Sequence, residues 1–129
     1  MVRAQALVID DNDDNLVVLS ELLSMNGVQS HTLRRPTDLS TFLQSISRLD
    51  VVFLDLEMPR MNGYEVLTAL KQHPRFGHVP VVAYTVHISE ITVAQQVGFH
   101  SFLGKPLDAD RFPDQLARIL NGEPVWAFV

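Results

Sequence analysis

The chain has no cysteine among its 129 residues and no apolar run long enough to cross a membrane. Without cysteine there is neither a disulfide framework nor a thiolate metal site, which favours a reducing compartment. A membrane span needs about 18 apolar residues. The opening stretch MVRAQALVIDDN reaches acidic residues too early for a signal peptide. We therefore expect a cytoplasmic protein that does not enter a membrane.

Positive charge is also scarce. The chain carries 10 Lys and Arg against 15 Asp and Glu, a formal charge of -5, and the basic residues are scattered. Binding to a phosphate backbone needs a basic stripe, so we do not expect this chain alone to bind nucleic acid. The hydrophobic fraction of 47% is that of an ordinary globular protein. We expect one domain over residues 1–122 and a short C-terminal tail over 123–129.

The sequence does contain an alternation of short apolar runs with stretches of helical period. Five runs predict strands, over residues 6–10, 28–33, 50–55, 79–84 and 101–104. Apolar residues at helical spacing predict helices over residues 16–23, 39–46, 64–71, 89–98 and 108–120. Strands that alternate with helices are typical of an α/β domain with a parallel sheet.

Two of the predicted strands end in carboxylates. Asp55 follows the apolar run Val51–Leu54, and Asp10 and Asp11 follow Leu7–Ile9. Parallel strands bring their carboxyl ends to one edge, where such sheets bind ligands. Two charges about 4 Å apart repel by ~4 kcal/mol at an effective dielectric of 20, so a cation is expected between them. Oxygen ligands alone suit Mg²⁺ better than zinc.

An acid pair after one strand is a weak signal by itself, because Asp11 or Asp13 could simply cap the following helix. Two further residues strengthen it. Thr85 and Lys105 lie where the fourth and fifth predicted strands end. A cation, a hydroxyl and an ammonium can share the charge of a phosphoryl group, and a carboxylate can accept one. This set predicts phosphoryl transfer to Asp55.

The motifs VIDDN, LDLEMPRMNG, YT and FLGKPL together resemble the response-regulator receiver domains, often called CheY-like. The resemblance extends from Leu7 to about Leu120 and implies a flavodoxin-like (βα)5 fold. This is a doubly wound sheet of five parallel strands in the order 2-1-3-4-5. Such a domain is a signalling phosphoacceptor of a two-component system. It is not an enzyme, although it takes part in its own phosphorylation and dephosphorylation.

The resemblance also implies the metal ligands and the phosphodonor. Asp10, Asp11, Asp55 and the backbone carbonyl of Glu57 would hold Mg²⁺ or Mn²⁺. Asp55 would accept the phosphoryl group from the phosphohistidine of a histidine kinase or of a histidine phosphotransfer protein.

The switch residues follow from the same resemblance. Thr85 and Lys105 would bind the phosphoryl oxygens, and Phe102 matches the aromatic switch position. Phe102 lacks the hydroxyl of the more common tyrosine, so we expect it to favour the inward rotamer. The surface of the fourth helix, fifth strand and fifth helix would change for a downstream protein partner or a homodimer. The Lys105–Pro106 peptide bond is expected to be cis.

Several alternatives stay open at the level of sequence. The stretch Asp11-Asn12-Asp13 superficially matches an Asp-nucleophile phosphatase of the haloacid dehalogenase type. A flavodoxin-like mononucleotide binder is disfavoured by the acids after the first strand, and a receiver that works unphosphorylated is a further alternative. Thr85 could cap the next segment, and Asn62-Gly63 is typical of a turn.

One residue departs from the family pattern, two lie at positions that vary within the family, and two lie in the tail beyond it. Val86 occupies a position where the family usually has a small residue, and we expect it to slow the access of water to a phosphoryl group on Asp55. Glu57 and His87 lie at variable positions that tune dephosphorylation in the family. In the tail, Trp126 and Phe128 could pack on the domain, occupy a partner's groove or begin a linker.

Overall fold

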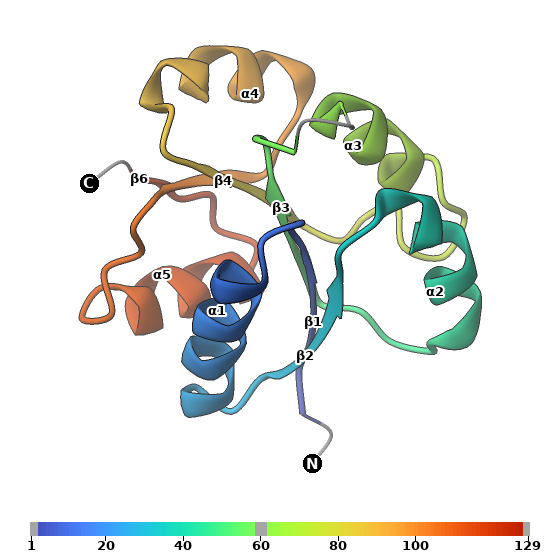
Figure 1. Ribbon diagram of the computed structural model, residues 1–129, viewed down its shortest axis with the longest axis horizontal. Coiled ribbons are helices and arrows are strands. Elements are labelled where there is room, and N and C mark those ends of the chain that lie inside the picture. The colour runs from blue at the N-terminus through green and yellow to red at the C-terminus, as the bar shows by residue number, and fades with distance from the viewer. Residues whose placement is uncertain (1–2, 59–61, 128–129) are drawn as a thin grey trace.

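The computed structural model describes residues 3–58 and 62–127, and its centre is one parallel sheet. The strands lie in the order β2-β1-β3-β4-β5-β6 (Figure 1). Their bounds are β1 Gln5–Ile9, β2 Gln29–Leu33, β3 Val51–Asp55, β4 Val81–Thr85, β5 Ser101–Gly104 and β6 Trp126–Ala127. The flavodoxin-like class and the order of the first five strands are confirmed, and the five-strand count is corrected by β6.

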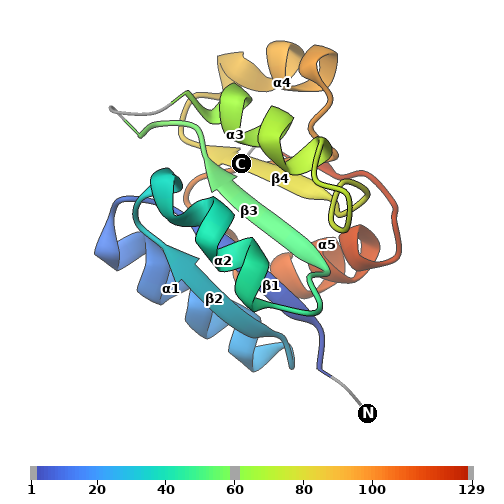
Figure 2. The same cartoon turned by 90° about the vertical axis from the view of Figure 1, so that its right-hand side faces the viewer.

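Helices cover both faces of the sheet (Figures 1 and 2). They are α1 Asp13–Met25, α2 Leu39–Ser45, α3 Gly63–Lys71, α4 Ile91–Val97 and α5 Phe112–Leu120, with short 3-10 turns at Pro36–Asp38 and Ile88–Glu90. One apolar cluster joins α1 and α5 to the sheet, and another joins α2, α3 and α4 to its opposite face. Every residue of β3, β4 and β5 is buried, as expected for strands covered on both faces.

Asparagine side chains, and not the aspartates we considered, cap the helices that border the acidic edge. Asn12 precedes α1, and its side chain accepts the N–H of Asn15 at 3.0 Å. Asn62 caps α3 in the same way, so the expected turn is a helix start. Gly63 begins that helix, and a Cβ there would lie 2.8 Å from Leu56 Cδ2, so a larger residue would require the Leu56 side chain to shift.

Two predicted helix boundaries are tested by the backbone. Gly98 ends α4 with φ 103°, a left-handed conformation that glycine adopts without strain, as predicted. The last helix begins at Phe112 and not at Asp108, because residues 108–111 form a turn. Pro113 lies in the first turn of this helix, where its missing N–H costs no hydrogen bond.

The tail adds the strand that the sequence pattern did not predict. Phe102 N–H donates to Val125 O at 2.8 Å, Val125 N–H donates to Ser101 Oγ at 3.0 Å, and Trp126 pairs with Phe102. Trp126 therefore packs on the domain, which was one of the three alternatives, whereas Phe128 lies outside the described residues.

The connection that leads to β6 explains why its pairing was hard to anticipate. From β5 to β6 the chain moves across the sheet in the same direction as it does from β3 to β4 and from β4 to β5. The connecting helix α5 nevertheless lies on the face of α1, whereas α3 and α4 lie on the opposite face. The crossover from β5 to β6 is consequently left-handed, the rare hand for parallel strands.

Within the described residues, no helix combines the length and the apolar character that a membrane crossing requires.

Candidate functional site

The strand register brings the predicted site residues to one edge of the sheet. Ile9 pairs with Leu54, Asp55 with Tyr84, and Thr85 with Gly104, so the residues that follow β1 and β5 flank the ends of β3 and β4. Successive side chains of a strand point to opposite faces. The core clusters place Tyr84 on the α1 and α5 face and Phe102 on the other.

Three carboxylates converge at this edge. One carboxylate oxygen from each of Asp10, Asp11 and Asp55 lies within 4.8 Å of the other two. Asp10 and Asp55 are buried whereas Asp11 is exposed. This all-oxygen set, open to solvent on one side, has the chemistry that Mg²⁺ or Mn²⁺ requires. The sequence prediction that these three acids meet agrees with the geometry.

Lys105 supplies the positive charge next to the two buried acids. Its Nζ lies 3.2 Å from Asp55 Oδ1 and 3.4 Å from Asp10 Oδ2, and the side chain is only 12% exposed. The Lys105–Pro106 peptide bond is cis, as the resemblance implied. A lysine held between two buried carboxylates is a fixed part of the site and not a solvated surface charge.

The two buried acids have opposite pKa shifts. Burial raises the pKa of Asp55 to about 6, although the Glu57 N–H and the Lys105 charge partly offset this. Burial acts in the same direction on Asp10, but hydrogen bonds from Tyr84 and Asn12 and the charge of Lys105 outweigh it and lower the pKa below 3.8. Asp10 is thus the permanent anion and Asp55 the carboxyl group that takes up a proton more readily.

Thr85, which ends β4, and Phe102, which lies within the neighbouring strand β5, are both fully buried. The Thr85 hydroxyl accepts the N–H of His87 at 3.1 Å, so it does cap the following segment as one alternative held. Phe102 lies inward in the core cluster of α2, α3 and α4. The structure therefore places Thr85 at the edge where the acids lie, with its hydroxyl engaged by the backbone, and Phe102 in the core below that edge.

Glu57 and His87 face each other above the acidic edge. Glu57 N–H donates to Asp55 Oδ1 at 3.0 Å, which fixes the Glu57 backbone next to the proposed acceptor. Its Oε1 lies 2.7 Å from His87 Nε2, an ion-pair distance without the alignment of a hydrogen bond. The two loops that follow β3 and β4 are in contact through this pair.

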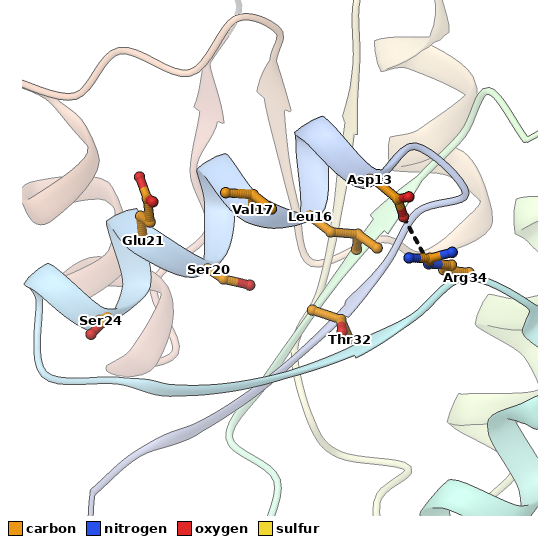
Figure 3. A pocket seen from close by; sticks show the side chains of 8 residues that line it. All are labelled: Asp13, Leu16, Val17, Ser20, Glu21, Ser24, Thr32 and Arg34. Carbon is orange, nitrogen blue, oxygen red and sulfur yellow. Dashed lines mark ion pairs between the residues drawn. The ribbon is translucent and has the colours of Figure 1, made fainter.

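Asp13 lies apart from the acidic site. It forms an ion pair with Arg34 at 2.7 Å, at one end of a groove of about 520 Å³ between α1 and β2 (Figure 3). Apolar and polar side chains of α1, among them Leu16 and Ser20, line the rest of this groove together with Thr32. The Asp11-Asn12-Asp13 stretch therefore does not deliver two acids to one site, as a phosphatase of the haloacid dehalogenase type would require.

Tyr84 is the site residue that the sequence reasoning did not assign. Its hydroxyl donates to Asp10 Oδ2 at 2.6 Å, and its ring lies 4.4 Å from Lys105 Nζ. Burial and the Asp10 carboxylate raise the pKa of this hydroxyl far above 10, so Tyr84 stays protonated. The sequence offered one signal for this role, which was the position of Tyr84 one residue before Thr85 and therefore on the other face of β4.

The fold and this edge define a doubly wound α/β protein with a buried carboxylate, two further acids and a lysine where the strands end. The chain belongs to the response regulator receiver domain family, whose model matches residues 6–117. Receiver domains of this family are signalling modules of two-component systems, and membership decides against the phosphatase and mononucleotide-binding alternatives.

Individual relatives agree with this assignment. Stress response regulator protein 1 of Meyerozyma guilliermondii is 32% identical over 112 residues, which cover 84% of this chain and 51% of that protein. Polar-differentiation response regulator DivK of Brucella anthropi is 26% identical over 89% of this chain and 94% of its own length. This chain spans about half of the first relative, and only 19% of another, protein RcaC of Microchaete diplosiphon.

Solved structures support the fold. A response regulator receiver domain protein from Clostridium thermocellum superposes with a TM-score of 0.80 at 28% identity, over 92% of this chain and 94% of that one. Chemotaxis response regulator CheY4 of Vibrio cholerae gives a TM-score of 0.80 at 23% identity, over 92% and 99% of the two chains, and shows the fold alone.

Proposed function

We propose that this protein is a Mg²⁺-dependent phosphoacceptor whose Asp55 takes a phosphoryl group from a histidine kinase or a histidine phosphotransfer protein. The observation that carries the proposal is the position of Asp55. It ends a buried strand 3.2 Å from the Lys105 ammonium, with oxygens of Asp10 and Asp11 within 4.8 Å. A buried carboxylate placed between cations is suited to accept and return a phosphoryl group.

In the proposed reaction a carboxylate oxygen of Asp55 bonds to phosphorus while the phosphorus–nitrogen bond of phosphohistidine breaks. The donor histidine keeps the electron pair of that bond. Asp10, Asp11, Asp55 and the Glu57 carbonyl would hold Mg²⁺, which when bound would supply positive charge that offsets the negative charge of the phosphoryl oxygens. Lys105 would bind one phosphoryl oxygen, and Thr85 would turn its hydroxyl from the His87 N–H to another.

The consequence of phosphorylation is proposed to be a change of the surface formed by α4, β5 and α5. Phe102 links that surface to the site, because it lies in β5 next to β4 and packs in the core cluster that includes α4. A downstream protein partner or a second copy of the chain would bind the altered surface. We place this signalling in the cytoplasm, where the expected kinase presents its phosphohistidine.

Mass spectrometry after incubation with acetyl phosphate and Mg²⁺ tests the central proposal. The wild-type protein should gain the mass of one phosphoryl group, and Asp55→Ala should gain none because the nucleophile is gone. Asp13→Ala is the matched control, since Asp13 is paired with Arg34 outside the acidic site. A mass gain that persists in Asp55→Ala would overturn the assignment of Asp55.

Val86 provides a second prediction, on the lifetime of the phosphorylated state. Its side chain is 53% exposed and lines a cleft of about 420 Å³ together with Glu57 and Lys105. We expect Val86→Ala to shorten the lifetime a few-fold, because the smaller side chain leaves more room for water. The decay of phosphorylated protein over time measures this. Val93→Ala, another exposed valine but on α4, should decay like wild type, and a longer lifetime in Val86→Ala would contradict the idea.

A further inference from the structure

Tyr84 makes two different contacts with the acidic site. Its hydroxyl donates to Asp10 Oδ2 at 2.6 Å, and the face of its ring lies under Lys105, with Nζ 4.4 Å from the ring centroid. Only 2% of Tyr84 is exposed. One buried side chain thus touches both a proposed metal ligand and the lysine that faces Asp55.

The contact with Asp10 fixes how that carboxylate is oriented. Oδ1 accepts the N–H of Asn12 at 2.9 Å, and Oδ2 accepts the Tyr84 hydroxyl, so both oxygens are held. Asp10 is fully buried, so the loss of a donor would leave one of its oxygens less well satisfied. The phenol is also a neutral donor, so it satisfies Oδ2 without adding positive charge next to a divalent cation.

The contact with Lys105 works through the ring. A lysine ammonium over an aromatic face is attracted by the negative potential of the ring. This attraction holds Nζ in the position where it reaches Asp55 Oδ1 at 3.2 Å. A phenylalanine keeps the ring contact and loses the hydroxyl, whereas a leucine loses both, so the two contacts can be separated by substitution.

We propose that Tyr84 is a positioning residue of the phosphoacceptor site, whose hydroxyl orients Asp10 for the divalent cation and whose ring holds Lys105 beside Asp55. The inference rests on the proposed function and deepens it. Among the described residues, loss of the hydroxyl leaves Lys105 at 3.4 Å as the donor to Asp10 Oδ2, and the ammonium is drawn towards Asp10, where it competes with the cation.

Binding of Mn²⁺ without any phosphodonor, followed by the electron paramagnetic resonance signal of the free ion, tests the hydroxyl. Tyr84→Phe should bind Mn²⁺ about tenfold more weakly than wild type, at the low end of the effect of losing an outer hydrogen-bond partner. Tyr64→Phe is the matched control. The Tyr64 hydroxyl donates to Glu90 at 2.7 Å, and this pair lies outside the acidic site. The Mn²⁺ affinity of Tyr64→Phe should therefore equal that of wild type.

Phosphoryl uptake from acetyl phosphate at increasing Mg²⁺ tests the ring. Tyr84→Phe should need more Mg²⁺ to reach half of its maximal rate, whereas Tyr84→Leu should in addition lose about threefold in the maximal rate, the loss expected for one cation–π contact. Thermal unfolding of each variant identifies the temperature at which all are folded for these assays.

The outcomes separate this inference from the proposed function. If wild type binds Mn²⁺ and Tyr84→Phe binds it equally well, the role of Tyr84 is wrong and the proposed function stands. If wild type binds no Mn²⁺ and gains no phosphoryl group, both fail. Equal maximal rates for Tyr84→Phe and Tyr84→Leu would refute the role of the ring.

Discussion

Replacing Asp55 with asparagine should stabilise the protein at neutral pH, by up to about 3 kcal/mol in the absence of divalent cations. Burial raises the pKa of Asp55 from 3.8 to about 6. Each pKa unit corresponds to about 1.36 kcal/mol of preference between the two protonation states. The ionised Asp55 therefore opposes folding above pH 6, and a neutral amide of similar shape removes that cost.

The sign of the pH dependence follows from the same shift. The unfolded protein loses the Asp55 proton near pH 3.8, whereas the folded protein keeps it until about pH 6. The free energy of unfolding of wild type should therefore fall as the pH rises through this window and remain lower above it. Asp55→Asn should lack this fall, so the difference between the two proteins should be largest at neutral pH and small near pH 4.

Urea denaturation in EDTA at a series of pH values measures this difference. Asp110→Asn is the control, because Asp110 is an exposed acid that does not belong to the cluster, and the stability of this variant should follow that of wild type. Addition of Mg²⁺ should stabilise wild type more than Asp55→Asn, because the cation favours the ionised carboxylate. An Asp55→Asn variant that is no more stable than wild type at neutral pH would show that the Asp55 charge is already compensated.

Replacing Lys105 with methionine should have the opposite effect and destabilise the protein at neutral pH by about 3–5 kcal/mol, the usual cost of leaving a buried charge without its partner. Lys105 is only 12% exposed and lies within 3.4 Å of both Asp10 and Asp55. Without the ammonium, two buried carboxylates remain close together. Methionine retains most of the side-chain volume, so the loss reflects charge and not a cavity.

Two comparisons isolate the electrostatic part of the Lys105 effect. Lys71→Met changes the chain's other lysine, which is exposed at the end of α3, and should cost little. Mg²⁺ should restore much of the stability that Lys105→Met loses, because the cation neutralises the same acids. Equal stabilities of Lys105→Met and wild type in EDTA, measured by urea denaturation at neutral pH, would contradict the prediction.

The sequence predicted the sheet well because its signals are local. The apolar runs before Asp10 and Asp55 are long enough for strands and too short for buried helices, and the alternation with helical stretches indicates parallel pairing. Parallel pairing alone brings the carboxyl ends of the strands to one edge. The meeting of Asp10, Asp11, Asp55 and Lys105 follows from this edge and from the strand order, in which β1, β3, β4 and β5 are successive neighbours.

The helix starts and the tail were less predictable, since several local choices have similar energies. Asp11, Asn12 and Asp13 are all good capping residues, and only the path of the chain after β1 selects Asn12. In the tail, the two-residue strand β6 depends on backbone contacts with β5 that have no periodic signal in the sequence. Its left-handed crossover also runs against the common rule.

The sequence by itself determined the α/β class and the set of charged residues that meet at one edge, and its resemblance to receiver domains implied the order of the first five strands. Only the tertiary structure decided how the pKa values of these acids differ. The Tyr84 hydroxyl reaches Asp10 from β4, two strands away, and lowers the pKa of that acid, whereas burial dominates at Asp55 and raises its pKa. Hydrogen-bond partners and burial depend on three-dimensional contacts between strands, which residue type and spacing along the chain do not specify.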